Sequence, residues 1–201
     1  TEYSINGVRI TPEEVVNGFQ NCIFVLPNTA GRGILELGEG GFFGKGKIDA
    51  AEVLSHVLHE PGEIAGNMEV ATLFCRHNKG VRRIKLLPNV VKEDAGLRPR
   101  FYPKGMTPRG ANKNADAVIE WDNGDKWVVD FKCMQGNGAK LKERLCDAYE
   151  QADYAVVKIC GEIKEIQKVI ETADRFMKGH HQFKGLIVYD NSDREIFRII
   201  K

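Results

Sequence analysis

Residues 114–132, Asn-Ala-Asp-Ala-Val-Ile-Glu-Trp-Asp-Asn-Gly-Asp-Lys-Trp-Val-Val-Asp-Phe-Lys, contain two apolar runs on either side of a polar turn sequence. The β-branched and aromatic residues that flank Asp-Asn-Gly-Asp predict a two-strand antiparallel hairpin. Successive side chains of a strand point to opposite faces, so Asp130 and Lys132 are expected on one face. Asp116, at the start of the first strand, adds a second acid, and this combination suits a divalent metal ion and a phosphate.

The length of the turn decides which residues of the two strands face each other. A two-residue turn at Asn123-Gly124 pairs Glu120 with Trp127, which is a poor match. A three-residue loop, with Gly124 in the left-handed conformation, pairs Glu120 with Lys126 instead. We prefer this register, which also pairs Val118 with Val128 and Asp116 with Asp130. It gathers an apolar surface on the opposite face, made of Ala115, Ala117, Ile119, Trp127, Val129 and Phe131.

An ordinary explanation competes with a functional one. The charged face of an antiparallel hairpin is often simply the solvated face. An aspartate beside a lysine is often a surface ion pair that contributes little to stability. Features elsewhere in the chain are needed to distinguish the solvated-face explanation from the functional one.

Composition limits the classes of protein to consider. The 201 residues are 42% hydrophobic and 28% charged, which is typical of one globular domain with at most an appendage. No apolar run reaches the length of a membrane span, and no N-terminal signal peptide is visible. The chain begins with Thr1, so we expect a processed product or a piece of a longer protein.

The five cysteines are scattered, without a Cys-x-x-Cys pair, which argues against a disulfide framework or a zinc ribbon. We expect buried thiols in a reducing compartment, with Cys133 of interest because it follows Lys132. The cysteines are Cys22, Cys75, Cys133, Cys146 and Cys160.

Positive charge is concentrated in the middle of the chain, although the net charge is only +1. Basic residues outnumber acids between Arg76 and Lys113, and prolines and aromatic residues in the same stretch predict an irregular loop. Such a loop can lie along a phosphate backbone, or it can be an ordinary solvated loop. The residues expected to contact nucleic acid are Arg98, Arg100, Lys104, Arg109, Lys113 and Lys140.

The first sixty residues are expected to form a small accessory region, with the main domain at residues 61–201. Residues 3–10 predict a small hairpin, residues 11–14 a helix start and residues 22–26 a buried strand. Residues 41–47, Gly-Phe-Phe-Gly-Lys-Gly-Lys, nearly spell a phosphate-binding loop, but Ile48 stands where that loop needs Ser or Thr. We therefore expect a structural loop there, followed by a helix from about Asp49.

The main domain shows an ordered series of elements. The patterns predict a helix at 63–79, a strand at 82–87, the hairpin, a helix at 139–152 and a strand at 154–160. A further helix at 162–178 and a hairpin of strands at 186–189 and 195–200 follow. The expected class is α/β (α+β), an αβββαβ core with a central mixed sheet and a C-terminal helix and hairpin.

This order and the motif Asp116…Asp130-Phe131-Lys132 resemble the PD-(D/E)xK nuclease superfamily, with Glu69 as the acid on the first helix. Ala115 replaces the family's proline. Residues 84–88, 114–119, 127–132 and 148–157 more closely resemble the C-terminal tRNase toxin domains of contact-dependent inhibition and other polymorphic toxins. The resemblance covers about residues 63–200.

The resemblance implies an endonuclease that hydrolyses phosphodiester bonds, with tRNA favoured over DNA. Asp116 and Asp130, with Glu69, would bind Mg²⁺ or Mn²⁺ through oxygen. Lys132 would orient a water or stabilise transition-state charge, and Gln151 would contact nucleic acid or support the site. It also implies a cognate immunity protein as partner and action in a reducing cytoplasm, as a module of a larger secreted or phage-borne protein.

Two alternatives remain open at this stage. Some toxin tRNases have the barnase-like fold shared with colicin and RelE ribonucleases, which cut RNA without metal, and His77, His180 or His181 would then transfer protons. The other alternative is a non-catalytic domain of a phage or toxin protein that keeps the hairpin without activity.

Overall fold

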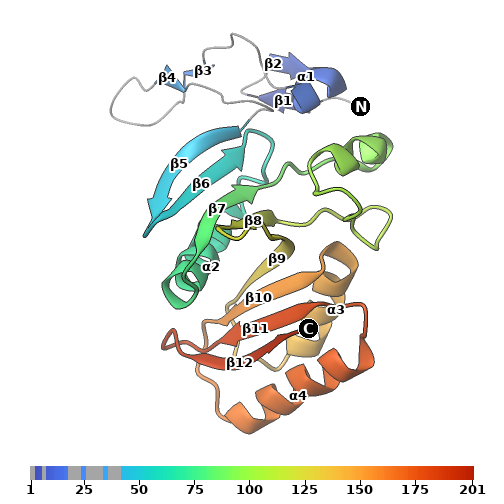
Figure 1. The fold of residues 1–201 in the computed structure, drawn as a ribbon. Helices are drawn as coiled ribbons and strands as arrows, with labels where there is room; N and C mark the ends of the chain where they lie inside the picture. The colour runs from blue at the N-terminus through green and yellow to red at the C-terminus, as the bar shows by residue number, and fades with distance from the viewer. Residues whose placement is uncertain (1–2, 6–7, 18–23, 26–33, 36–41) are drawn as a thin grey trace.

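The computed structural model describes residues 3–5, 8–17, 24–25, 34–35 and 42–201. Its centre is an eight-stranded mixed sheet in the order β12-β11-β10-β9-β8-β7-β6-β5 (Figure 1). The strands are β5 (Phe42–Ile48), β6 (Ala51–His56), β7 (Val81–Leu86), β8 (Ala117–Trp121), β9 (Lys126–Met134), β10 (Tyr154–Ile159), β11 (Gly185–Tyr189) and β12 (Glu195–Ile200).

The expected αβββαβ order is confirmed. Helix α2 (Ile64–His77) precedes β7, β8 and β9, and helix α3 (Leu141–Gln151) connects β9 to β10. The C-terminal helix α4 (Ile166–Gly179) and the β11–β12 hairpin complete the domain. Because β9 and β10 are parallel, α3 serves as the crossover between them.

The helices cover both faces of the sheet. Val70 and Phe74 of α2 pack on Ile119, Val129 and Phe131, and all five side chains are buried. On the other face, α3 and α4 bury a second apolar cluster that includes Leu145, Ala148, Ala173, Phe176, Val157 and Leu186. Since side chains alternate along β9, Asp130 and Lys132 point away from α2, toward the α3 face.

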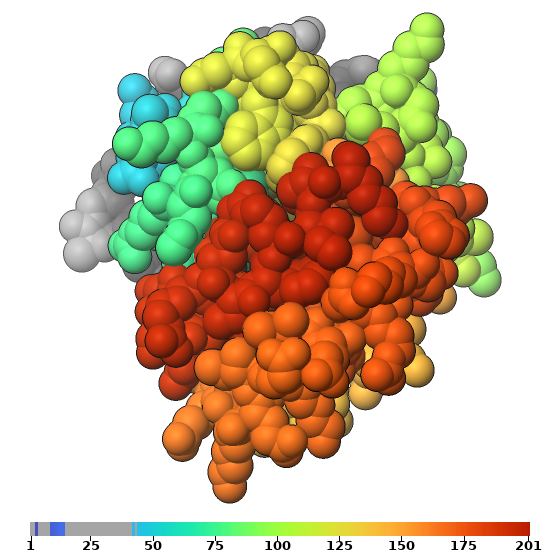
Figure 2. All heavy atoms as spheres, turned by 60° about the horizontal axis from the view of Figure 1, so that its bottom comes forward, coloured from blue at the N-terminus to red at the C-terminus, as the bar shows by residue number. Residues whose placement is uncertain are grey.

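The register predicted for the β8–β9 hairpin is confirmed. Glu120 faces Lys126 and Val118 faces Val128. Gly124 has a φ of 90°, in the left-handed region that the three-residue loop requires. The turn is anchored to the α2–β7 connection, since Asp122 N donates to Gly80 O at 2.8 Å, and the two segments lie side by side in Figure 2.

One residue of the hairpin lies on a different face from the one predicted. Ala115 packs with Val118 and Val128 instead of with Ala117. It precedes β8, and its backbone N–H donates to the Tyr102 hydroxyl at 3.1 Å, so strand alternation does not extend to it.

The N-terminal region contributes more to the sheet than expected. Strand β6 runs parallel to β7, and β5 pairs with β6 at the sheet edge, so the main sheet begins before residue 61. The helix expected from about Asp49 is wrong, because Asp49 adopts a φ of 51° in a tight turn and Ala51–His56 is β6. Most of the segment that resembles a phosphate-binding loop belongs to β5 (residues 42–48) and does not form a loop.

Smaller elements lie before the sheet. The predicted small hairpin is present as β1 (Tyr3–Ile5) paired with β2 (Val8–Ile10), and helix α1 spans Pro12–Asn17. Strands β3 (Phe24–Val25) and β4 (Ile34–Leu35) form a separate pair. The rest of the predicted strand at 22–26 lies outside the described residues. None of the described helices combines the length and hydropathy that a membrane-spanning segment needs.

We predict that Gly124→Ala destabilises the fold by about 1–2 kcal/mol, because an L-residue is strained at this φ. The melting temperature should fall by about 2–8 °C in thermal denaturation. Gly44→Ala is the control, since Gly44 lacks a positive φ and a Cβ there meets open space. Equal effects of the two substitutions would contradict the assigned role of Gly124.

Candidate active site

Asp116 lies where the chain enters β8 and is 8% exposed. Its Oδ2 accepts a hydrogen bond from the backbone N–H of Phe131 at 2.8 Å, and its backbone oxygen accepts one from Leu87 N at 2.8 Å. These bonds attach Asp116 to both neighbouring strands. They hold its carboxylate beside β9, as the register predicted.

Asp130 is fully buried in β9. Its Oδ1 accepts a hydrogen bond from Lys132 Nζ at 2.9 Å, and the Gln151 amide, turned so that donors meet acceptors, donates to the same oxygen at 3.1 Å. Oδ2 has no hydrogen-bond partner. Burial, followed by the charge of Asp116, raises the pKa of Asp130 well above its ordinary value of 3.8.

Lys132 supplies positive charge beside the two carboxylates. Desolvation lowers the pKa of Lys132, but the charges of Asp130 and Asp116 outweigh it and raise this pKa above its ordinary value of 10.5. Lys132 is therefore a cation at neutral pH, and its role is to donate hydrogen bonds and neutralise negative charge rather than to act as a base.

A hollow of about 850 Å³ opens in front of this cluster. Asp116 and Lys132 line it from the sheet, and Glu63 lines it from the N-terminus of α2. Partial desolvation and the charge of Asp116 raise the pKa of Glu63, so the two carboxylates act on each other. Residues 135–140 of the loop before α3, with Arg144, form another wall.

Glu63, at the start of α2, is an acid whose pKa is raised by burial and by the charge of Asp116. Glu69 also lines the hollow, but its Oε1 pairs with Lys158 Nζ at 2.7 Å and its Oε2 accepts from Cys133 Sγ at 3.6 Å. The sequence feature that could have identified Glu63 is its position at the start of the predicted helix. The sequence located that start correctly but could not show which acid of the helix reaches the hairpin.

Gln151 contacts the carboxylate cluster. It ends α3, and its amide nitrogen bridges Asp130 Oδ1 and the backbone oxygen of Asn114, the latter at 2.8 Å. Gln151 fixes the orientation of the Asp130 carboxylate.

Two of the residues expected to contact nucleic acid have internal partners instead. Arg98 is 5% exposed and donates to Asn114 Oδ1 and to the backbone oxygen of Val90, each at 3.0 Å. It folds the segment 89–114, in which the 3₁₀ helix η2 spans Lys92–Arg100. Arg109 donates to the Tyr149 and Ala152 backbone oxygens, at 2.8 and 2.6 Å, and so holds the C-terminal end of α3.

The other four expected contacts lie at or near the surface. Arg100 and Lys104 are exposed, and Lys140 is exposed at the rim of the hollow. Lys113 forms an ion pair with Glu150 at 3.6 Å. Besides Lys132, the basic residues that line the hollow are Lys140 and Arg144.

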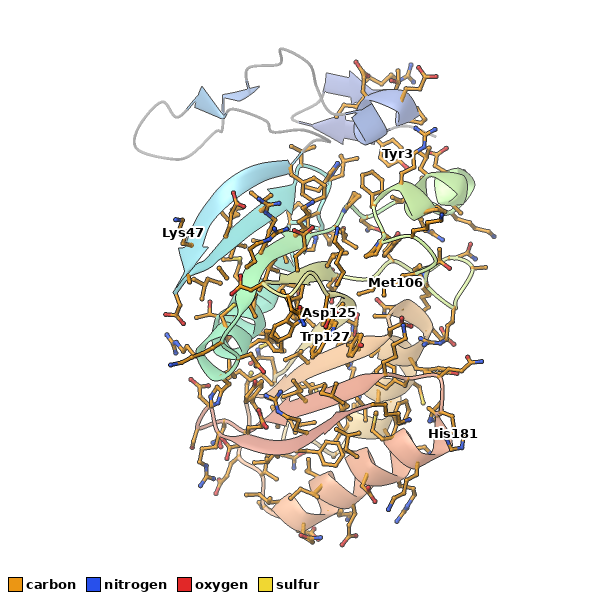
Figure 3. All side chains as sticks on the ribbon, viewed as in Figure 1. Tyr3, Lys47, Met106, Asp125, Trp127 and His181 are labelled. Carbon is orange, nitrogen blue, oxygen red and sulfur yellow. The ribbon has the colours of Figure 1, made fainter. Side chains whose placement is uncertain are left out.

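The histidines considered for metal-free cleavage lie away from the carboxylate cluster. His77 ends α2, so about 20 Å of helix separates it from Glu63. His180 follows α4 and stacks on Phe176 at 3.9 Å, and Figure 3 shows His181 at the same end of α4. The described geometry places no histidine on the walls of the hollow.

The cluster fits a hard divalent cation. Two carboxylates lie side by side and share a hydrogen bond when one of them is protonated, and no other donor reaches the buried Oδ2 of Asp130. Magnesium and manganese are bound through such oxygens. Asp116 and Asp130 would hold the ion.

Comparisons with protein-family models, with curated proteins and with solved structures found no match to this chain.

We predict that Asp116→Asn stabilises the metal-free protein. The raised pKa of Asp130 means that the folded state favours its protonated form, so the stability it contributes is present at low pH and is lost as pH rises from about 3.8 through the raised pKa. Removing the charge of Asp116 reduces this loss of stability. The asparagine oxygen can still accept the hydrogen bond from Phe131 N.

In EDTA, the melting temperature of the variant should exceed that of the parent by about 2–4 °C at neutral pH, or roughly 1 kcal/mol. The difference should shrink as the pH falls toward the ordinary pKa value of 3.8, because protonation of Asp130 removes its repulsion from Asp116 in the parent. A variant less stable than the parent across this range would contradict the arrangement.

Proposed function

We propose that this protein is a metal-dependent endonuclease of the PD-(D/E)xK type that hydrolyses phosphodiester bonds in nucleic acid. The observation that carries the proposal is the convergence of Asp116, Asp130 and Lys132, in which Asp116 and Lys132 line an open hollow and the buried Asp130 lies behind them with one carboxylate oxygen that no donor reaches. A surface ion pair does not account for it, because Asp130 is fully buried.

Each residue has a distinct role in this proposal. Asp116 and Asp130 hold Mg²⁺ or Mn²⁺, which polarises the scissile phosphate and activates a water when bound. Lys132 stays protonated and stabilises the negative charge that develops on the phosphate. Gln151 and the Phe131 N–H hold the two carboxylates in place.

The charge around the hollow fits a polyanionic substrate. Lys140 and Arg144 at the hollow provide phosphate contacts close to the reacting group, and phosphate contacts position a nucleic acid without reading its sequence. The motif resemblance to toxin tRNases favours tRNA over DNA. That resemblance also suggests a cognate immunity protein as partner and a reducing cytoplasm as the place of action.

We predict that Asp116→Ala, Asp130→Asn and Lys132→Met each lower the cleavage rate by about 100-fold or more, because each removes charge that acts in the transition state. The assay incubates purified protein with total tRNA and, separately, with plasmid DNA, each with Mg²⁺ and with EDTA. Circular dichroism should show that the variants remain folded.

Asp174→Asn and Lys178→Met are matched controls, since these residues form an exposed ion pair on α4, outside the hollow. They should cut at the parental rate. Glu63→Gln should reduce cleavage more than Glu69→Gln. Cleavage that persists in EDTA would point to metal-free chemistry, and full activity in all three site variants would exclude this site.

A further inference from the structure

A second group of potential metal ligands lies next to Lys132, around the following residue of β9. The thiols of Cys133 in β9 and Cys160, directly after β10, are 3.2 Å apart. The Glu69 carboxylate approaches Cys133 from α2, with Oε2 3.6 Å from Sγ. Among the described residues, these form the set of three acid, thiol or imidazole ligands that lie within 4.8 Å of one another.

The backbone around the two thiols is fixed. Cys160 N donates to Met134 O at 2.7 Å, and Gly161 N donates to Gly136 O at 3.1 Å. A Cβ at residue 161 would lie 2.7 Å from the Gly136 oxygen, so only glycine allows the two segments to approach this closely. The convergence of the cysteines is therefore a consequence of the strand ends and not of side-chain rotation alone.

The sulfur separation is closer to that of a metal-bound pair than to that of a disulfide. Two thiolates bound tetrahedrally to zinc at 2.3 Å lie about 3.8 Å apart, so a separation of 3.2 Å must open by about 0.6 Å. A disulfide of about 2.05 Å requires the sulfurs to close by more than about 1.1 Å.

The Glu69 carboxylate has one oxygen available on the side of the thiols. Its Oε1 is paired with Lys158 Nζ, which also pairs with Asp193, each at 2.7 Å. Oε2 has Cys133 Sγ as its neighbour. A cation between Oε2 and the two sulfurs would therefore leave the ion pair with Lys158 intact.

We propose that Cys133, Cys160 and Glu69 form a second metal site that takes a thiophilic divalent cation of the Zn²⁺ class. Sulfur ligands select zinc over magnesium or manganese, so this site and the carboxylate cluster discriminate by ligand type. The exposed amide of Gln135 lies beside the cluster, with Nε2 3.6 Å from Cys133 Sγ and 4.0 Å from Cys160 Sγ.

The site would act on the structure rather than on the substrate. It joins α2, the end of β9 and the end of β10, and its ligand Cys133 directly follows Lys132. A bound ion would tie α2 to the strand that carries Asp130 and Lys132. Its effect on stability follows from its binding to the folded state alone.

The test uses the full chain, reduced and freed of metal. Stoichiometric Co²⁺ should produce a thiolate-to-cobalt charge-transfer band, and Zn²⁺ should displace it with one equivalent per chain. Zn²⁺ should also raise the melting temperature. Cys133→Ser and Cys160→Ser should each abolish the band, and Glu69→Gln should weaken zinc binding about 10-fold or more.

Cys146→Ser is the matched control, since Cys146 is exposed and lies outside the cluster. Asp116→Asn should also keep the band, which separates this site from the carboxylate cluster. A parent without the band, or a band that survives loss of either Cys133 or Cys160, would overturn the proposal. So would a protein in which molecular oxygen oxidises Cys133 and Cys160 to a disulfide although one equivalent of Zn²⁺ is present.

Discussion

Two carboxylates held against each other, one of them fully buried, form the constraint on which the rest of this structure depends. Asp130 cannot reach water, and Asp116 is fixed beside it by the Phe131 N–H. The pairing follows from the β8–β9 register, which the left-handed Gly124 sets in the turn at the opposite end of the hairpin. A shift of one residue would send one acid to the α2 face and separate the pair.

The surrounding fold compensates for this unfavourable charge pair. Lys132 and Gln151 satisfy one oxygen of Asp130, and the apolar clusters on both faces of the sheet hold the strands in place. The second oxygen remains unsatisfied. Buried groups are rarely left in this state in proteins, and a bound cation would resolve both the missing partner and the repulsion. Under the proposed function, a bound ion would offset this cost to the stability of the metal-free protein.

The sequence predicted the parts of the molecule in which local pattern and tertiary structure agree. The hairpin register, α2, α3 and β10 follow from strand alternation, helix periodicity and glycine placement. It failed at residues 49–56, where a helix-forming sequence is held as a strand by pairing with β7. It also could not show that Arg98 and Arg109 bind backbone oxygens, because those partners belong to segments distant in sequence. Glu63 and Glu69 differ in role for the same reason, since only the packing of α2 shows which one faces Asp116.

The most direct test of the central claim is a Mn²⁺ titration followed by electron paramagnetic resonance, which distinguishes free from protein-bound ion. The parent should bind Mn²⁺ at the carboxylates, and Mg²⁺ should compete for the same site. A variant with both Asp116→Ala and Asp130→Ala should leave the added Mn²⁺ free, whereas Cys133→Ser should bind it as the parent does. Equal binding by the parent and the double aspartate variant would contradict the assignment of this cluster as a divalent-cation site.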